Sequence, residues 1–197
     1  MQTTRAKIMQ AAYVEFEARG YAQASTNRIV SMAGVSKGTL FNYFGSKEKL
    51  YQECIEDAIS TTISETDNFL YKETGFIERM YELMQFKQTF QVKYPELTQF
   101  LSRAYLNRTL PKPYLERMDV FGQTSIQSLF EDLDLRRFRD DLAHDTMMDL
   151  IRWTIDGYSE HMQKLWQSGV IDLEDLGPHY DAFYTHLEAM KKLYYKE

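Results

Sequence analysis

Several features that define other classes of protein are scarce or missing in this chain. Cys54 is the only cysteine among 197 residues, so an intrachain disulfide is excluded. No apolar run approaches the roughly 20 residues of a membrane-spanning helix, and the N-terminal segment lacks the apolar core of a signal peptide. We therefore expect a cytoplasmic protein that does not enter a membrane.

Motifs of enzymes and metal sites are also missing. The sequence holds no glycine-rich phosphate loop, no G-x-S-x-G elbow and no HExxH pair. His179 and His186 are seven residues apart, which is too far for them to bind one ion together along a helix. Cys54 has no basic neighbour closer than Lys49, so we interpret it as a small buried side chain. We expect no catalytic site, no metal and no cofactor.

The composition is that of a folded, mainly helical protein. Hydrophobic residues make up 44% of the chain, aromatic residues 14% and charged residues 26%, which suffices for a core and argues against disorder. Strand-like alternation is absent, whereas apolar residues recur at helical spacing along almost the whole sequence. We predict an all-α fold of about nine helices.

Charge is divided unevenly along the sequence. Residues 1–50 contain seven Lys and Arg side chains against three Glu, a formal charge of +4, whereas the whole chain carries −6. Residues 51–197 therefore carry −10. This division predicts that only the N-terminal segment approaches a polyanion such as DNA. Chance clustering of charges is the alternative explanation.

The N-terminal segment has the spacing of a helix-turn-helix. Helices are predicted over about residues 4–19, 26–33 and 37–44, with a fourth from about residue 47. Gly20 and Gly34 suit the left-handed conformation that ends a helix, and Ser36 and Ser46 stand where a hydroxyl would cap the next one. A unit of this kind presents its second short helix to the major groove of DNA.

The predicted helix 37–44 has the features that a groove-reading helix needs. Gly38 has no side chain, so the backbone of the first turn can approach DNA closely, and the free amides there favour a phosphate oxygen. Leu40 and Phe44 are four residues apart and are predicted to pack inward. Asn42 is suited to paired hydrogen bonds with adenine.

Other residues of this segment complete the predicted DNA contacts. Thr39 offers its hydroxyl to a base or phosphate and its methyl group to thymine, and Phe41 offers a ring contact to thymine. Tyr43 and Lys47 are assigned to phosphates. The candidate DNA-binding residues are Thr26, Asn27, Arg28, Ser36, Lys37, Gly38, Thr39, Phe41, Asn42, Tyr43 and Lys47. For each polar side chain taken alone, a solvated helix face is the alternative.

At these residues the sequence resembles the TetR-type (TetR/AcrR) transcriptional regulators. The resemblance covers about residues 5–50 and rests on Ile8, Ala11, Ala12, Phe16, Gly20, Tyr21, Thr26, Ile29, Ala33, Gly34, Val35, Ser36, Gly38, Thr39, Tyr43, Phe44, Lys47, Glu48 and Leu50. Val30 and Ser31 depart from the pattern, in which an alanine commonly follows the isoleucine. Beyond residue 50 the resemblance is limited to length, helix count and two long final helices.

The resemblance implies a function and a division of the chain. Residues 1–46 would form a helix-turn-helix DNA-binding domain, and residues 47–197 a helical ligand-binding and dimerisation domain. The implied protein is a homodimeric repressor that binds double-stranded DNA at a palindromic operator and is released by a small-molecule inducer. The fourth helix is the implied link, because a stiff helix displaced at its core end must also move at its DNA end.

The last two predicted helices, about residues 142–168 and 178–194, are rich in apolar residues. Phe183 and Leu187 belong to a run with three- and four-residue steps, which favours packing against another helix at a shallow angle. We predict a homodimer through these two helices. An ordinary monomeric core is the alternative.

Large or adaptable residues of the middle and late helices are candidates for lining an inducer site. They are Phe86, Phe90, Arg103, Tyr105, Met118, Phe121, Trp153 and Tyr158. With 12 Phe and 14 Tyr in the chain, we expect a lipophilic or aromatic inducer. Arg103 or Arg152 could meet a carboxylate on it, and Asp119 or Asp156 could meet a cation. The alternative for each aromatic residue is an ordinary place in the core.

Two classes of function therefore stay open. The first is a ligand-responsive, DNA-binding regulator. The second is a helical small-molecule-binding or interaction module that keeps the N-terminal motif without using it on DNA. Selection from random duplexes separates them, because only the regulator would enrich an inverted repeat and lose affinity steeply with salt.

Overall fold

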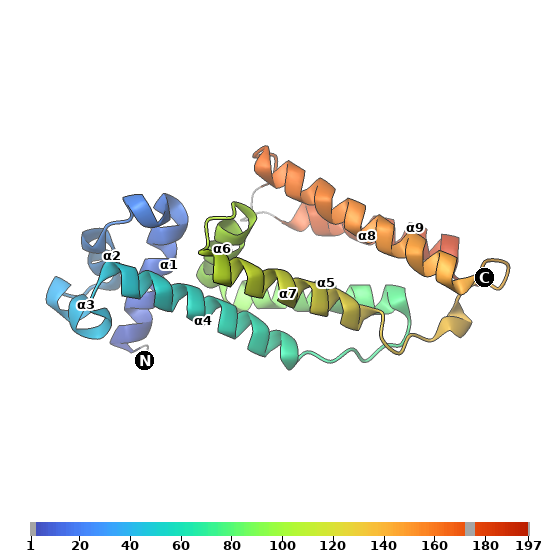
Figure 1. The fold of residues 1–197 in the computed structure, drawn as a ribbon, viewed down its shortest axis with the longest axis horizontal. Coiled ribbons are helices and arrows are strands. Elements are labelled where there is room, and N and C mark those ends of the chain that lie inside the picture. The colour runs from blue at the N-terminus through green and yellow to red at the C-terminus, as the bar shows by residue number, and fades with distance from the viewer. Residues whose placement is uncertain (1–2, 172–175, 197) are drawn as a thin grey trace. The chain divides into compact units, whose positions relative to one another are not determined.

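The computed structural model describes residues 3–171 and 176–196 (Figure 1). In these ranges the regular structure consists of nine α-helices and one short 3₁₀ helix, so the predicted all-α class is confirmed. The elements are α1 (Thr4–Gln23), α2 (Thr26–Ala33), α3 (Lys37–Phe44), α4 (Lys47–Asp67), α5 (Phe76–Lys93), α6 (Pro95–Leu106), α7 (Lys112–Leu129), η1 (Leu135–Arg137), α8 (His144–Gln167) and α9 (Gly177–Tyr194).

The chain divides into two compact units. Unit 1 comprises residues 1–69 and 90–121, and unit 2 comprises residues 70–89 and 122–197. Helices α1 to α4 and α6 belong to unit 1, α8 and α9 belong to unit 2, and α5 and α7 contribute residues to both. Each unit has a hydrophobic core of its own. The boundary at residue 46 stays a prediction.

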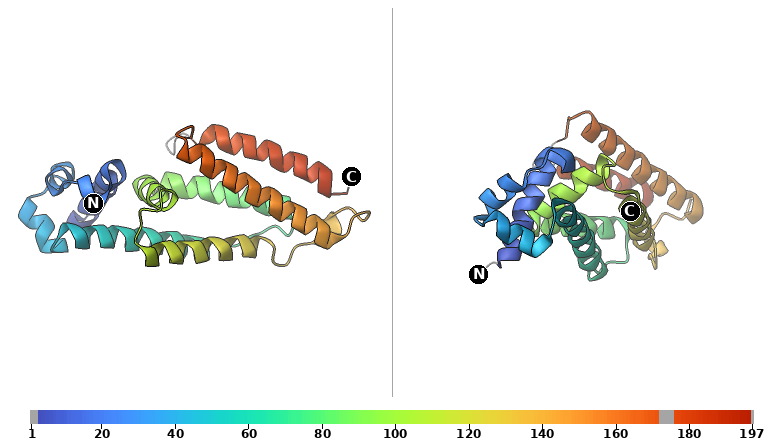
Figure 2. Two further views of the ribbon diagram at one scale, coloured as in Figure 1. Left: turned by 45° about the horizontal axis from the view of Figure 1, so that its top comes forward. Right: turned by 60° about the vertical axis from the view of Figure 1, so that its left-hand side comes forward.

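In unit 1, α1 packs against α2, α4 and α6 (Figure 2). The Phe16 ring lies in an aromatic cluster, with its centroid 4.9 Å from that of Tyr51 and 6.4 Å from those of Tyr21 and Phe100. Gly20 adopts a φ of 66° inside α1, so the regular turns end there and Tyr21 folds back beside Phe16. This packing gives the two short helices α2 and α3 a rigid support.

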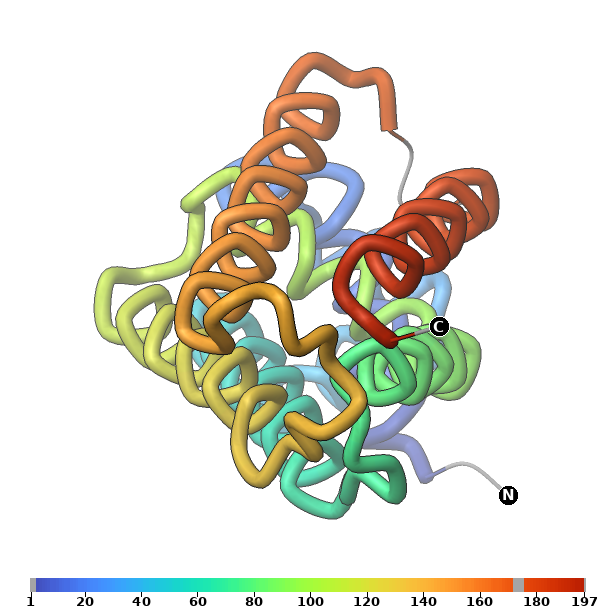
Figure 3. Tube along the Cα trace, turned by 90° about the vertical axis from the view of Figure 1, so that its right-hand side faces the viewer, coloured from blue at the N-terminus to red at the C-terminus, as the bar shows by residue number. Residues whose placement is uncertain are grey.

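In unit 2, α5 packs with α8 and α9 around the second core (Figure 3). The Tyr81 ring stacks on that of Tyr184 with centroids 5.2 Å apart, while the Ile77 amide donates to the Tyr195 hydroxyl at 3.1 Å. These contacts show that α5 and α9 run side by side in opposite directions. The buried side chains of this core are Phe76, Ile77, Met80, Met84, Leu129, Phe138, Met147, Ile151, Ile155, Phe183, Leu187 and Met190.

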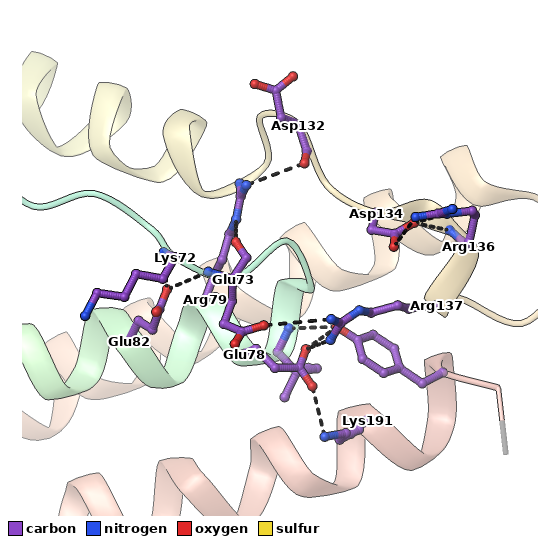
Figure 4. Close-up of polar contacts among 12 residues, drawn as sticks. Lys72, Glu73, Glu78, Arg79, Glu82, Asp132, Asp134, Arg136, Arg137 and Lys191 are labelled. Carbon is purple, nitrogen blue, oxygen red and sulfur yellow. Dashed lines mark hydrogen bonds and ion pairs between the residues drawn. The ribbon is translucent and has the colours of Figure 1, made fainter.

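Glu78 ties three segments of unit 2 together at the start of α5 (Figure 4). Its carboxylate accepts the Tyr195 hydroxyl at 2.9 Å, and it pairs with the Lys191 ammonium at 2.9 Å and the Arg137 guanidinium at 3.3 Å. A Cβ at Gly75 would lie 2.1 Å from the Glu78 Oε2 atom, so a larger residue there would displace this carboxylate. The cluster holds the end of α9 and η1 against α5.

Arg79 is a buried cation whose partners are backbone carbonyls (Figure 4). Its guanidinium donates to the carbonyls of Glu73 at 2.7 Å, Leu129 at 3.4 Å and Asp132 at 3.5 Å, and also to that of Glu131. Because Leu129 is the last residue of α7, these bonds satisfy carbonyls that the helix end leaves open. Arg79 therefore joins the segment before α5 to the end of α7.

Replacing this buried guanidinium tests its structural role. We expect Arg79→Lys to lower the free energy of unfolding by about 2–3 kcal/mol, because one ammonium cannot reach all of these carbonyls. The control is Arg136→Lys, at a side chain that is 90% exposed, which should leave the free energy of unfolding nearly unchanged. Urea denaturation followed by circular dichroism measures both, and equal losses would contradict the role given to Arg79.

Candidate DNA-binding interface

The turn between α2 and α3 is fixed by hydrogen bonds of the backbone. Gly34 has left-handed φ and ψ of 64° and 38°, and its amide donates to the Ser31 carbonyl at 3.3 Å. The next amide, of Val35, donates to the Val30 carbonyl at 3.1 Å. These bonds close the end of α2 in the conformation that glycine favours, as predicted from the sequence.

Two serines cap the N-terminal ends of α3 and α4, as predicted. The Ser36 hydroxyl accepts the Thr39 amide at 3.0 Å, and the Ser46 hydroxyl accepts the Lys49 amide at 3.1 Å. Ser36 also shares a hydrogen bond of 2.8 Å with the Thr39 hydroxyl. The Thr39 hydroxyl is therefore already engaged within α3, and its methyl group is the part left for an outside contact.

Helix α3 has one buried side and one exposed side. Leu40 and Phe44 are 0% and 2% exposed, so their predicted inward packing is confirmed. The outward side chains include Tyr43, which is 51% exposed, and Phe41, which is 36% exposed. Lys37, Gly38 and Asn42 are exposed beside them.

Arg28 is engaged by a buried carboxylate. Its Nη2 and Nε atoms donate to Glu15 at 2.6 Å and 2.9 Å, and Nη2 also reaches the Gln23 carbonyl at 2.9 Å. The same carboxylate accepts the Ser25 amide at 2.8 Å, at the start of α2. Arg28 therefore joins α1 to α2. Arg28 thus has a structural role in the protein itself, and its assignment as a DNA contact stays a prediction.

Glu15 was not among the predicted site residues, yet its carboxylate joins α1 to the start of α2. The side chain is buried in the inward stripe of α1, between Ala12 and Phe16. Burial by itself raises the pKa of Glu15, but the bonds from Arg28 and from the Ser25 amide outweigh it and hold the pKa below its usual value. The available signal was a single acidic residue in an otherwise apolar helical stripe.

Other candidate DNA-binding residues lie close to α2 and α3. The Lys47 ammonium donates to the Ala22 carbonyl at 3.3 Å and lies 4.7 Å from the centroid of the Tyr21 ring. Asn27 is exposed on the first turn of α2, and Thr26 beside it is partly buried. To reach a phosphate, the Lys47 ammonium would have to break its hydrogen bond to the Ala22 carbonyl or donate to both acceptors at once.

The eight ligand candidates are divided between the two units, and their assignment stays a prediction. Phe90, Tyr105 and Met118 pack against the core of unit 1, Tyr158 packs against that of unit 2, and Trp153 is 67% exposed on α8. The remaining candidates, Phe86, Arg103 and Phe121, are partly buried.

The two cations proposed to meet a carboxylate have partners within the chain. Arg103 pairs with Glu17 at 2.5 Å, and the Arg152 guanidinium lies 4.6 Å from the centroid of the Phe130 ring. Two open hollows on the surface of unit 1 are lined by other residues. One, of about 430 Å³, lies in unit 1 between α1, α2 and Glu96, and the other, of about 300 Å³, adjoins Ser60 and Tyr94.

Two further searches of residues 3–171 and 176–196 gave negative results. No cluster of His, Cys, Asp or Glu side chains in these ranges could hold a metal ion. None of the helices described there is long and apolar enough to cross a membrane. Cys54 is fully buried, and burial raises the pKa of its thiol.

Comparison with known proteins identifies the stretch that carries this geometry. Residues 8–54, which run from α1 into α4, match the family described as bacterial regulatory proteins, tetR family. Over this segment the chain is similar to the TetR family. Its fold agrees, since a TetR-like transcriptional regulator from Rhodococcus sp. RHA1 aligns over 95% of this chain and 93% of that one, with a TM-score of 0.61 and 19% identity.

Relatives of this chain differ in how much of it they match. The HTH-type transcriptional repressor AcnR of Corynebacterium diphtheriae is 25% identical over 157 residues, 78% of each protein. The nucleoid occlusion factor SlmA of Haemophilus influenzae is 33% identical over 84 residues, 43% of this chain and only 38% of SlmA. A structure described as a gamma-butyrolactone receptor (ArpA-like protein) has the same fold over 96% of both chains, with a TM-score of 0.56 and 20% identity.

Removing the Glu15 carboxylate tests its role in joining α1 to α2. We expect Glu15→Ala to lower the free energy of unfolding by about 2–3 kcal/mol at neutral pH, because Arg28 and the Ser25 amide lose their shared acceptor. The control, Glu53→Ala, removes the more exposed ion pair with Arg5 and should cost less than about 1 kcal/mol. Thermal or urea denaturation measures both losses.

The pH dependence of that loss follows from the pKa of Glu15. Because its folded pKa is lowered, the carboxylate stabilises the fold above its unfolded pKa of about 4.3. That stabilisation disappears as the pH falls through the lower, folded pKa. The difference between the wild type and Glu15→Ala should therefore shrink below about pH 4. A difference that stays constant with pH would contradict this account.

Proposed function

We propose that this protein is a transcriptional repressor that binds a palindromic DNA operator as a homodimer and is released by a small lipophilic or aromatic inducer. The observation that carries the proposal is the tip formed by α2, its glycine turn and α3. There, a short helix is anchored by Leu40 and Phe44 while its other side is exposed. The relation to a protein described as a transcriptional repressor, at 25% identity over 78% of both chains, supports the same reading.

In the proposed complex α3 enters the major groove with its N-terminal turn leading. Gly38 leaves room for the DNA backbone there, and a phosphate would bind the free amides of that turn. Asn42 and Phe41 would contact base edges, and Tyr43 and Lys37 would bind phosphates. The formal charge of +4 on residues 1–50, against −10 on the rest, favours one orientation toward DNA.

A homodimer would supply the second copy of α3 that an inverted repeat requires. Exposed apolar side chains on α8 and α9 support this part of the proposal. Trp153 is 67% exposed, Leu193 58% and Leu150 38%. Phe183 and Leu187, from which we predicted the interface, are instead buried in the core of their own chain, so that choice of residues is wrong.

Release by an inducer would act through α4. Its residues Leu50, Ile55 and Ile59 are fully buried in unit 1, and the chain passes into unit 2 soon after α4 ends. We infer that an inducer shifts α4, and with it the cap at Ser46 and the adjoining tip. A loss of DNA affinity of about a hundredfold needs a coupling free energy of about 3 kcal/mol. A fold neighbour described as a gamma-butyrolactone receptor supports a small-molecule ligand.

Selection from random duplexes tests the DNA-binding part. We expect the wild type to enrich an inverted repeat and to lose affinity steeply with salt. Asn42→Ala should reduce discrimination at one base position by about 5- to 100-fold, whereas Tyr43→Ala should weaken binding to all duplexes by about tenfold. The control is Lys192→Ala, at an exposed cation on α9. If no symmetric motif is enriched even at low salt, the protein belongs to the alternative class, a helical interaction module that does not act on DNA.

Substitution of an exposed apolar side chain tests the dimer. We expect Trp153→Glu to give a monomer in sedimentation equilibrium, because the substitution would bury a carboxylate at the subunit contact. The matched control is Val92→Glu on α5, where the side chain is 82% exposed, which should leave the dimer intact. A Trp153→Glu protein that sediments as a dimer would exclude this surface as the interface.

A further inference from the structure

Lys47, the first residue of α4, carries a positive charge that no carboxylate balances within the described ranges. Arg28 nearby in the sequence differs, because it pairs with Glu15 at 2.6 Å. The partners of the Lys47 ammonium are both neutral. They are the Ala22 carbonyl at 3.3 Å and the ring of Tyr21, whose centroid lies 4.7 Å away. The charge of Lys47 is therefore available to a group outside the chain.

The stability of α4 does not explain a lysine at this place. The amino end of a helix carries a partial positive charge, so a cation in its first turn is slightly unfavourable for the helix. The Ser46 hydroxyl already caps α4 by accepting the Lys49 amide at 3.1 Å. The benefit of Lys47 therefore lies in contacts outside α4.

Tyr21 reaches Lys47 because the backbone of α1 changes direction at Gly20. The φ of 66° there produces a kink that folds Tyr21 back toward the helix. Its ring centroid lies 6.4 Å from that of Phe16 and 4.9 Å from that of Tyr51. The Tyr21 side chain nevertheless stays 41% exposed. Tyr21 is therefore supported by the core of unit 1 and still open to solvent at its edge.

The second partner of Lys47 is a carbonyl in the last turn of α1. Carbonyls there lack an intrahelical amide and carry the partial negative charge of a helix end, which favours a cation. The ammonium of a lysine has three N–H donors, so two remain after the bond to Ala22. Neither the carbonyl nor the Tyr21 ring has a formal charge. Together they orient the ammonium without neutralising it.

We propose that Tyr21 is a positioning residue for DNA binding, whose ring, with the Ala22 carbonyl, holds the Lys47 ammonium where it donates to a DNA phosphate. This inference rests on the proposed function, because it explains how the phosphate contact predicted for Lys47 is prepared. A lysine that is already held loses less side-chain freedom when the phosphate binds. Tyr21 was not among the predicted DNA-binding residues, because it and Lys47 belong to different helices.

The position of the ammonium is testable by NMR without DNA. An aromatic ring shields protons over its face, so the Hε protons of Lys47, assigned with Lys47→Arg, should resonate upfield of those of other lysines. We expect Tyr21→Leu, which removes the ring and keeps an apolar side chain, to abolish this shift. Tyr21→Phe keeps the ring and should retain it. The matched control is Lys49, an exposed lysine of the same helical turn, whose signal should not respond to either substitution.

A double-mutant cycle with DNA tests the consequence for binding. Fluorescence anisotropy measures the affinity for a labelled random-sequence duplex at low salt, where phosphate contacts dominate. We expect Tyr21→Leu to weaken binding about two- to tenfold, which corresponds to the entropy of fixing one long side chain. Tyr21→Phe should restore most of this affinity. In Lys47→Met, which lacks the ammonium, Tyr21→Leu should cause no further loss.

A purely structural role of Tyr21 would give a different result. A substitution that only loosened the packing around Phe16 would weaken binding equally with and without Lys47, and equal losses would overturn the proposal. A Lys47 signal that does not respond to Tyr21→Leu would overturn it as well. Circular dichroism of each variant verifies that it is folded.

Failure of the proposed function is distinguishable from failure of this inference. A wild type that binds no duplex would contradict the proposed function and the phosphate contact with it. The NMR signal would still decide whether Tyr21 holds Lys47, because that measurement uses no DNA. The control for charge is Lys192→Met, which removes an exposed cation from α9 and should leave duplex affinity unchanged.

Discussion

The burial of Leu40 and Phe44 beneath α3 is the constraint on which the proposed interface depends. With these two side chains fixed in the core of unit 1, the other side of a helix of only eight residues must face outward. So short a helix would not be stable alone, because its few hydrogen bonds do not compensate the entropy lost in forming it. Its order comes from α1 and α4, from the Gly34 turn and from the caps at Ser36 and Ser46.

Buried charge is handled in two different ways in this chain. Glu15 is neutralised by Arg28, and Arg79 is satisfied by the carbonyls around the end of α7. Both arrangements join segments and explain why a charge is kept inside.

Much of the fold was predictable because the signals are local. Gly34 adopts the left-handed conformation that ends α2, Gly20 has a positive φ at the kink of α1, Pro95 begins α6, and both capping serines make the expected bonds. Each depends on the chemistry of a few neighbouring residues. The inward packing of Leu40 and Phe44 followed from their spacing, and so did the outward position of Asn42 and its neighbours.

By itself, the sequence determined the all-helical class, the helix-turn-helix and the resemblance to the TetR family, since all three depend on periodicity and on residues close together in the chain. Only the tertiary structure decided which partner each long side chain has. It gave Arg28 to Glu15, Arg103 to Glu17 and Lys47 to the Ala22 carbonyl. The physical reason is that a side chain's partners are set by helices distant in sequence, and spacing along one helix carries no information about them.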